Sequence, residues 1–228
     1  MSQDTQALRA QLFDHIIEAQ RDQAVELLTI QGIARGFSHA VREILEPVLL
    51  EIGERWAKDR LSLAQGYVAG KVAEDILVKM AQSSPPPEKS PKGPVVIGNI
   101  EDDYHALGRK MVAVFLAAAG WKVVDLGNDV LPAQFVDKAE EVSARVIGVS
   151  AMMLTTAENI RFVRQELDRR GLTGRVQLAV GGAVINLRPE LASALGGDGT
   201  CQNAIQAPGL FDTLWARSLA FEGCHELP

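Results

Sequence analysis

Residues 95–108 read VVIGNIEDDYHALG, an apolar run followed by an acidic turn and the first residues of a segment with helical spacing. The run Val95–Ile100 predicts a strand, and the segment Leu107–Ala119 predicts a helix. A strand that leads through a short turn into a helix is the repeating unit of α/β folds. This stretch therefore predicts an α/β architecture for the chain around it.

The segments after this stretch alternate in the same way. The predicted strands are Lys122–Leu126, Val146–Ser150, Val176–Val180 and a weaker one near Asp198–Gln202. The predicted helices are Pro132–Ser143, Ala157–Arg170, a short one after Arg188, and Leu210–Phe221. The run Val146–Val149 is apolar throughout, which is typical of a strand covered on both faces. We expect an open, doubly wound parallel sheet of about five strands, in the flavodoxin-like (Rossmann-type) class.

The first 82 residues show helical spacing instead. Four helices are predicted from apolar residues three or four apart: Leu8, Leu12 and Ile16; Ala24, Leu27 and Leu28; Val41, Ile44, Leu45, Val48 and Ile52; Val68, Val72, Ile76 and Met80. Pro47 predicts a bend or a break in the third helix. The segment Ser62–Gln65, with sequence SLAQ, has the form of a capping box at the start of the fourth. Short connections favour antiparallel neighbours, so we expect a four-helix bundle.

Residues 83–94 separate these two parts. They read SSPPPEKSPKGP and contain five prolines in twelve residues. Proline lacks the backbone N–H that a helix or a central strand requires, so an extended and stiff linker is predicted. The expected organisation is a helical domain of residues 1–82, the linker 83–94, and an α/β domain of residues 95–228.

The composition limits the class of protein. The 228 residues are 47% hydrophobic and 23% charged, which is ordinary for a globular protein. The net charge of −6 argues against a nucleic-acid surface, which needs clustered Lys and Arg. There is no apolar run of membrane-spanning length, the polar start is unlike a signal peptide, and two cysteines do not form a disulfide framework. These features predict a cytoplasmic protein.

The turn after the first predicted strand carries Asp103, His105 and Gly108 in the pattern D-x-H-x-x-G. A histidine in a strand-to-helix turn suits a metal ligand, because a carboxylate two residues earlier can accept the hydrogen bond of the other ring nitrogen. Gly108 leaves room for a bulky ligand at the backbone. The alternative is structural, since either Asp103 or His105 can cap the helix that follows.

Two further segments fall on the same predicted edge of the sheet. Ser150 ends the third strand, and Gly181-Gly182 follow the fourth. In doubly wound sheets, ligands bind outside the carboxyl ends of the strands. The hydroxyl of Ser150 can donate and accept a hydrogen bond there, and the glycines admit a flat group against the backbone. A tight turn is the alternative for the glycine pair.

Asp102 and Asp103 could instead form the acidic pair of a response-regulator receiver, which shares this fold. That interpretation requires a phosphorylatable aspartate at the end of the third strand. Ser150 stands there, so we disfavour a receiver.

The three segments resemble the cobalamin-binding domain of corrinoid-dependent methyltransferases and cobalamin-dependent mutases, which combines D-x-H-x-x-G, S-x-L and G-G. The resemblance implies that His105 is the lower axial ligand of cobalt, in base-off, His-on cobalamin, with Asp103 as its hydrogen-bond partner. It also implies that Ser150 and the glycine pair line a slot for the nucleotide tail. The full set of implied cofactor contacts is Asp103, His105, Ala106, Leu107, Gly108, Ser150, Met152, Gly181, Gly182 and Trp56.

The helical half is similar to the methionine-synthase-like cap bundle that precedes such domains. The resemblance rests on Ile52–Trp56, with sequence IGERW, and on Leu61–Gln65, with sequence LSLAQ. It implies that Trp56 shields the corrin ring, although a core position is equally consistent with a tryptophan in a bundle.

The chain has no segment large enough for a substrate barrel. The resemblance therefore implies a corrinoid carrier, whose cobalt accepts and donates a methyl group between substrate-specific and acceptor-specific methyltransferases. The alternative is a cobalamin-binding sensor that acts through a protein partner, and a cobalamin chaperone is a third option. A homodimer is left open.

Overall fold

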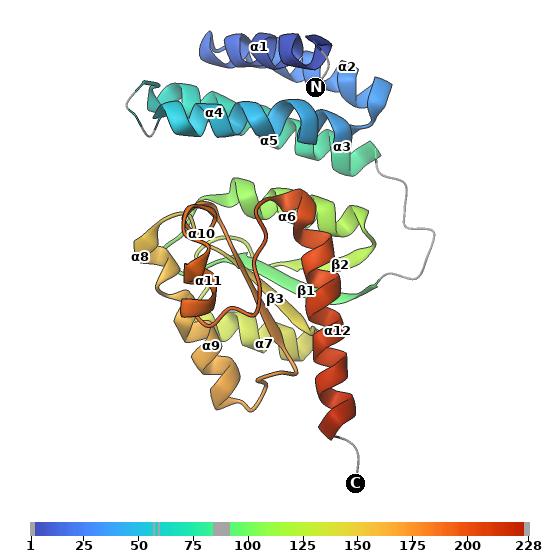
Figure 1. Ribbon diagram of the computed structural model, residues 1–228, viewed down its shortest axis with the longest axis vertical. Helices are drawn as coiled ribbons and strands as arrows, with labels where there is room; N and C mark the ends of the chain where they lie inside the picture. Colours follow the sequence, from blue (N-terminus) through green and yellow to red (C-terminus); the bar gives the residue numbers. More distant parts are fainter. Residues whose placement is uncertain (1–2, 57, 59, 84–91, 226–228) are drawn as a thin grey trace. The chain divides into compact units, whose positions relative to one another are not determined.

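The computed structural model describes residues 3–56, 58, 60–83 and 92–225. The chain divides into two compact units, Met1–Pro85 and Pro86–Pro228 (Figure 1). Helix α5 extends through Ser83 and strand β1 begins at Lys92, so both elements reach into the predicted linker 83–94. Residues 84–91 of that linker lie outside the described part of the chain.

All the secondary structure of the first unit, within its described residues, is helical. Its elements are α1 (Gln3–Ile17), α2 (Arg21–Arg35), α3 (Phe37–Ala40), the π-helical turn η1 (Val41–Leu45), α4 (Glu46–Trp56) and α5 (Leu63–Ser83). The core is formed by the predicted apolar positions, with these side chains fully buried: Leu12, Ile16, Leu28, Ile44, Leu45 and Ile76. The predicted bundle is confirmed, with its third helix divided into α3, η1 and α4.

The division of the third helix follows from Pro47. Proline has no N–H, so the carbonyl of Glu43, four residues earlier, lacks its helical donor. The structure supplies one from another helix, since Arg9 Nε donates to the Glu43 carbonyl at 2.7 Å. The N–H of Glu46 donates five residues back, to Val41, in the π-helical manner. The chain stays helical across Pro47, so the predicted bend or break takes the form of a change from π-helical to α-helical hydrogen bonding just before it.

The predicted capping box is present at the start of α5. The Ser62 N–H donates to Gln65 Oε1 at 2.9 Å, and the Gln65 N–H donates to Ser62 Oγ at 3.3 Å. Gln65 Nε2 also donates to the carbonyl of Ile17 in α1, at 3.3 Å. The same side chain therefore starts α5 and ties it to the end of α1.

The second unit is built on a parallel sheet of four strands in the order β2-β1-β3-β4. The strands are β1 (Lys92–Asn99), β2 (Trp121–Asp125), β3 (Val146–Ser150) and β4 (Gln177–Gly181). The connecting elements are α6 (Ala106–Ala118), α7 (Pro132–Val142), α8 (Leu154–Ala157), α9 (Ile160–Arg169), α10 (Ala183–Leu187), α11 (Glu190–Ala194), the 3-10 turn η2 (Ala204–Gln206) and α12 (Ala207–His225). The predicted flavodoxin-like strand order is confirmed.

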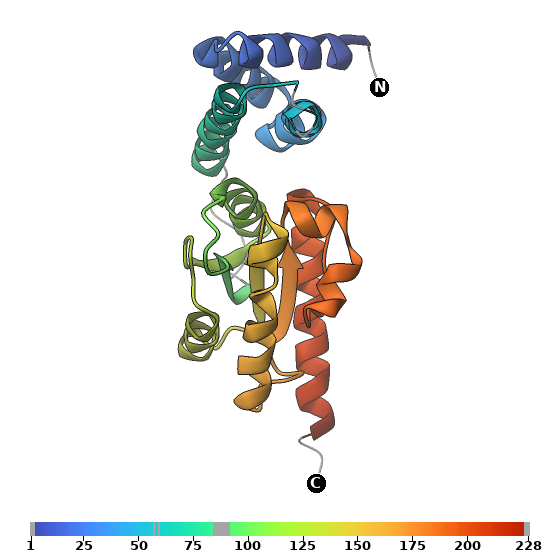
Figure 2. The ribbon, with the colours of Figure 1, turned by 90° about the vertical axis from the view of Figure 1, so that its left-hand side faces the viewer.

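Helices cover both faces of this sheet, with α7 and α9 on one face and α6 and α12 on the other. Figure 2 shows α9, in gold, and α12, in red, on either side of β4. The two central strands, β1 and β3, each carry a glycine against which an aromatic ring packs, one ring on each face of the sheet. A side chain at Gly98 would meet the ring of Phe135 in α7, and one at Gly148 would meet the ring of Phe211 in α12. These close approaches fix both layers on the sheet.

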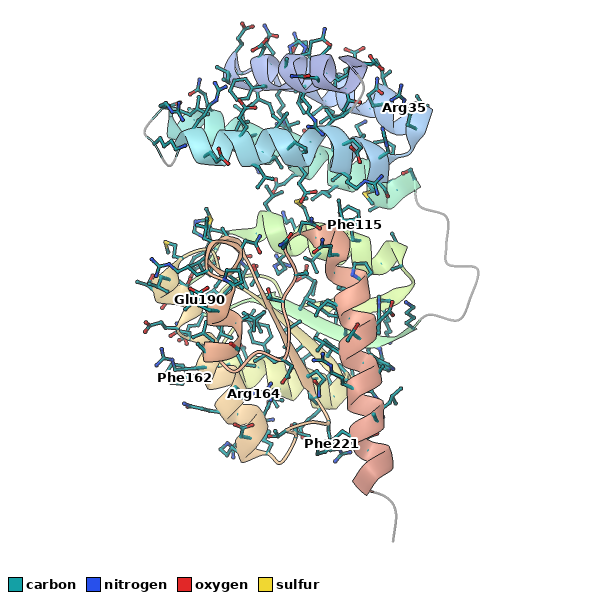
Figure 3. The ribbon with its side chains drawn as sticks, in the orientation of Figure 1. Arg35, Phe115, Phe162, Arg164, Glu190 and Phe221 are labelled. Atoms are coloured by element: carbon teal, nitrogen blue, oxygen red, sulfur yellow. The ribbon has the colours of Figure 1, made fainter. Side chains whose placement is uncertain are left out.

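The predicted fifth strand near Asp198–Gln202 is wrong, and β4 is an edge strand of the described sheet. Asp198 pairs with Leu178 through both its main chain and its side chain: its backbone N–H donates to the Leu178 carbonyl at 2.7 Å, and its carboxylate accepts the Leu178 N–H at 2.6 Å. A single bridge follows, in which the N–H of Val180 donates to the Gly199 carbonyl at 2.9 Å. Arg164 of α9, labelled in Figure 3, holds Asp198 with an ion pair at 2.5 Å. Among the described residues, no further bridge to β4 follows Gly199.

None of the helices within the described ranges is long and apolar enough to cross a membrane.

Candidate functional site

The carboxyl ends of three strands lie side by side at one edge of the sheet. Asn99 at the end of β1 pairs in register with Ser150 at the end of β3, which pairs with Gly181 at the end of β4. The chain continues from β1 into the turn 100–105, and Ile100 N–H donates to the Ser150 carbonyl at 3.1 Å. The three segments that the sequence predicted to meet are therefore neighbours at this edge.

Asp103 is the centre of the polar contacts at this edge, and its side chain is 0% exposed. Its Oδ1 accepts hydrogen bonds from Asn99 Nδ2 and from the backbone N–H of His105, both at 2.9 Å. Its Oδ2 accepts from the backbone N–H of Met152 at 2.7 Å and from Thr156 Oγ1 at 3.0 Å. Four donors from β1, its turn and the segment after β3 thus hold one carboxylate.

The charge state of Asp103 follows from these contacts. Burial alone raises the pKa of the carboxyl group, but the hydrogen bonds from Met152, His105, Asn99 and Thr156 favour the ionised form and bring its pKa below the usual value. The carboxylate is therefore ionised at neutral pH and can only accept hydrogen bonds.

His105 stands at the N-cap position of α6, and its side chain makes no capping hydrogen bond. Its Nδ1 lies 3.3 Å from Asp103 Oδ1, and the side chain is 47% exposed. With Nδ1 facing the carboxylate, Nε2 is left for a partner outside the loop. This is the arrangement of a metal-binding histidine whose second nitrogen is held by a carboxylate, and it argues against the capping alternative.

Asn99 and Arg109 belong to the same polar cluster, and the sequence analysis missed both. The Asn99 side chain is 0% exposed and Arg109 is 6% exposed. Arg109 Nε donates to Asn99 Oδ1 at 2.9 Å, and its terminal nitrogens pair with Asp125 and, at 3.3 Å, with Asn128 Oδ1. One signal was available, since Asn99 is a lone polar residue in an otherwise apolar strand.

A second set of contacts holds the outer side of the turn. Tyr104 Oη donates to Asp129 Oδ2 at 2.6 Å, and the backbone N–H of Asp102 donates to Asp129 Oδ1 at 2.9 Å. Asp102 and Asp129 both adopt left-handed φ angles, of 65° and 56°. Asp102 is exposed, whereas both oxygens of Asp103 are occupied, so the two do not form the acidic pair of a receiver.

The two glycines after β4 have different surroundings. A Cβ at Gly181 would meet nothing within 4 Å, so its carboxyl-edge position faces open space. Gly182 has a φ of 110°, and a Cβ there would lie 2.0 Å from the Ala151 carbonyl oxygen. Gly182 is therefore required by the backbone at the start of α10, as the tight-turn alternative for this pair predicted, and its place in a slot stays a prediction.

The other predicted contacts are placed as follows. Ala106 and Leu107 are half-buried in the first turn of α6, and Gly108 has open space around its Cα. Met152 contributes its backbone N–H to Asp103, while its side chain is exposed. Trp56 ends α4, but its side chain lies outside the described residues.

The number of metal-ligating side chains at this edge limits the kind of metal centre that it could hold. Among the described residues, no three His, Cys, Asp or Glu side chains are grouped to hold a metal ion. His105 would be a single imidazole ligand, so a metal bound there needs its other ligands from a preformed cofactor. Within the same described part, Thr200 Oγ1, beside the single bridge to β4, is buried without a hydrogen-bond partner. A large cofactor with polar groups fits this donor set.

Comparisons with known proteins agree with this chemistry. A family model described as a B12 binding domain matches residues 93–207, and a second B12 binding domain model matches residues 8–78. The chain belongs to the B12-binding corrinoid proteins. Its cofactor is therefore cobalamin, and the two matches fall on the two units of the structure.

Two relatives illustrate the family. Trimethylamine corrinoid protein 1 of Methanosarcina mazei is 34% identical over 169 residues, which cover 74% of this chain and 74% of that protein. The dimethylamine corrinoid protein of Methanosarcina barkeri is 31% identical over 204 residues, covering 88% of this chain and 93% of that protein.

Solved structures show the same fold. The Methanosarcina barkeri monomethylamine corrinoid protein superposes with a TM-score of 0.79 at 23% identity, covering 90% of this corrinoid protein and 97% of that chain. A chain of the methanol:cobalamin methyltransferase complex MtaBC of the same organism gives a TM-score of 0.50 at 23% identity, covering 92% and 80%.

Proposed function

We propose that this corrinoid protein is the methyl carrier of a multi-component methyltransferase system. The observation that carries the proposal is His105, whose Nδ1 faces the buried carboxylate of Asp103 at 3.3 Å while half of its side chain is exposed. Cobalamin, when bound, supplies a cobalt centre that accepts and releases a methyl group. The protein supplies binding, orientation and electrostatics.

His105 is proposed as the lower axial ligand of cobalt, through Nε2. Asp103 accepts the hydrogen bond of Nδ1–H, which fixes the tautomer that leaves the Nε2 lone pair for the metal and raises the basicity of the ring. Because Asp103 is ionised and already accepts four other hydrogen bonds, the carboxylate is held in place before the cofactor arrives. The proton stays at Nδ1 and the charge stays on Asp103.

The nucleotide tail is proposed to enter the edge between β3 and β4. Ser150 ends β3, Gly181 faces open space, and Thr200 Oγ1 is buried without a partner among the described residues. A buried hydroxyl without a hydrogen-bond partner destabilises the folded protein. A ligand that forms this hydrogen bond would remove that cost, which favours binding. Gly108 would leave room for the corrin ring beside α6, and Trp56 remains a proposed contact from the helical unit.

The proposed partners are a methyltransferase that delivers the methyl group and another that removes it. The curated relatives are named for trimethylamine and dimethylamine, and one structural neighbour belongs to a methyltransferase complex. We therefore propose methylated amines as the methyl donors of this system.

The ligand role is tested with His105→Ala and a control, His39→Ala, in α3 of the helical unit. The protein is labelled with ¹⁵N-histidine, loaded with ¹⁴N-cobalamin and reduced to Co(II). Electron paramagnetic resonance of wild type and His39→Ala should show the two-line splitting of one axial ¹⁵N nucleus, and His105→Ala should show none. A three-line ¹⁴N splitting in the wild type would mean that the cofactor's own base binds cobalt, and the proposal would fail.

The carrier role is tested with the fully reduced holoprotein. Methyl iodide should methylate it, and a methyltransferase from the same genome should then remove the methyl group. If none of these enzymes demethylates the protein, and loss of the upper ligand instead changes its partner-bound state, the sensor interpretation replaces the carrier.

A further inference from the structure

Arg109 places a buried positive charge next to the residues that hold His105. Its guanidinium lies on the first turns of α6, is 6% exposed, and reaches three oxygens: Asn99 Oδ1, Asp125 Oδ1 and Asn128 Oδ1. Taking a guanidinium out of water is costly, and its ion pair with Asp125 offsets that cost. The bond to Asn99 is the one that points toward the proposed cofactor site.

The hydrogen-bond pattern fixes which way the Asn99 amide points. Arg109 is only a donor, so the atom that faces it must be the amide oxygen. The amide nitrogen then donates to Asp103 Oδ1 at 2.9 Å and to the His105 carbonyl at 3.1 Å. A rotated amide would set its NH₂ against the guanidinium and its oxygen against the carboxylate, so only one orientation satisfies the guanidinium, the carboxylate and the His105 carbonyl.

We propose that Arg109 is a positioning residue for the His105 loop, acting through the amide of Asn99. The inference rests on the proposed role of His105 as cobalt ligand. By holding Asn99 Oδ1, Arg109 keeps the two amide hydrogens on Asp103 and on the His105 carbonyl, so that the carboxylate and the ligand loop move together. Asp125, on the outer strand β2, anchors the guanidinium and extends the support to the sheet.

The experiment compares Arg109→Met and Arg109→Lys with the control Arg170→Met. Arg170 is the C-cap residue of α9, has a side chain that is 19% exposed, and pairs with Glu166, Glu140 and Asp137, away from Asp103. In the apo-protein, hydrogen exchange is followed at the backbone N–H groups of His105 and Met152, which both donate to Asp103. Each exchange rate is divided by the rate of a backbone amide in β3. A general loss of stability raises both rates, so it leaves this ratio unchanged.

Arg109→Met should raise exchange at both amides by about tenfold or more relative to β3, because the support of a buried acceptor is lost. Arg109→Lys keeps the charge, but a single ammonium group lacks the planar array of N–H donors with which the guanidinium bonds Asn99 and Asp125 at once. The exchange rates of this variant should therefore lie between those of wild type and Arg109→Met. If Arg109→Met does not fold, Arg109→Lys provides the comparison. Rates that match those of Arg170→Met at both amides would overturn the proposal.

The second readout is the axial nitrogen signal of the Co(II) form. A smaller fraction of ¹⁵N-split signal in Arg109→Met, with full signal in Arg170→Met, supports the role of Arg109 toward the ligand, and an unchanged fraction contradicts it. A wild type without that signal would refute ligation by His105 itself. The exchange rates in the apo-protein would then still decide whether Arg109 holds the loop.

Discussion

Two carboxylates of the α/β unit are both held in the ionised form, but by different means. Asp103, at the carboxyl edge of the sheet, is 0% exposed and is held by hydrogen bonds from neutral donors and the ring of His105. Glu166, in α9, lies beside arginines, and its hydrogen bonds to Arg169 and Arg170 lower its pKa to about 2. The first group is fixed by the tertiary fold, whereas the second is paired mainly within one helix.

This difference separates a functional site from a surface ion-pair cluster. The partners of Glu166 are three and four residues away on its own helix, so they form wherever the helix forms, and such pairs contribute little to stability. The partners of Asp103 come from β1, its turn and the segment after β3. They meet only in the folded sheet, so an anion with fixed direction exists at this edge before a cofactor binds.

The largest effect is expected at Gly181. Gly181→Leu adds a side chain that meets no protein atom near its Cβ, so the free energy of unfolding should change little, while the proposed tail slot is filled. Cobalamin binding should fall at least about a hundredfold, since a steric block prevents insertion and costs more than one lost hydrogen bond of about 1 kcal/mol. Equilibrium titration with cobalamin measures this. Wild-type affinity in a folded Gly181→Leu protein would place the tail elsewhere.

A smaller effect is expected for Asp103→Asn. The substitution keeps the shape but replaces one carboxylate oxygen by an NH₂ group. Each oxygen accepts two hydrogen bonds, so two donors lose this acceptor, at a cost of about 1–3 kcal/mol for each that stays buried and unsatisfied. Loss of the charge that supports the His105 ring should weaken cobalamin binding about 10–100-fold. Urea unfolding measures the loss of stability, and titration with cobalamin measures the loss of affinity.

The matched control for Asp103→Asn is Asp102→Asn, at the neighbouring exposed carboxylate with a left-handed backbone that asparagine also adopts. It should leave affinity and stability near the wild-type values. Equal effects of the two substitutions would show that the net charge of the turn matters, rather than the buried carboxylate.

The smallest effect is expected for Glu166→Gln, which should leave cobalamin binding unchanged. Because the pKa of Glu166 is lowered from its usual 4.5 to about 2, its stabilising contribution is present above pH 4.5 and is lost as the pH falls toward 2. The small stability difference between wild type and Glu166→Gln should therefore shrink over that range. Urea unfolding at pH 7 and pH 3 tests this, and a difference that grows on acidification would contradict it.

Much of the architecture could be predicted from local patterns. The apolar runs predicted the four observed strands, and the spacing of three and four residues predicted the helices. The Ser62–Gln65 capping box was interpreted correctly, and Pro47 marked the residue next to which the helical hydrogen bonding changes, because these signals act within a few residues of chain. The D-x-H-x-x-G turn pointed to His105 and Asp103 for the same reason, since the proposed ligand and its hydrogen-bond partner are two residues apart.

The long-range features needed the folded sheet. The predicted fifth strand is reduced to a single bridge at Gly199, beside Asp198, whose backbone N–H and carboxylate both pair with Leu178, twenty residues away. Gly182 proved to be a backbone requirement because Ala151 packs against it from the neighbouring strand end. Neither contact leaves a local pattern in the sequence.

The sequence by itself determined the order of strands and helices and the identity of the histidine and aspartate, since both depend on neighbours in the chain. Only the tertiary structure decided what holds Asp103: Met152 and Thr156 lie 49 and 53 residues further along, and Asn99 is fixed by Arg109 from α6. Hydrogen bonds are short and directional, so a buried carboxylate acquires its partners only when distant segments meet with ångström accuracy.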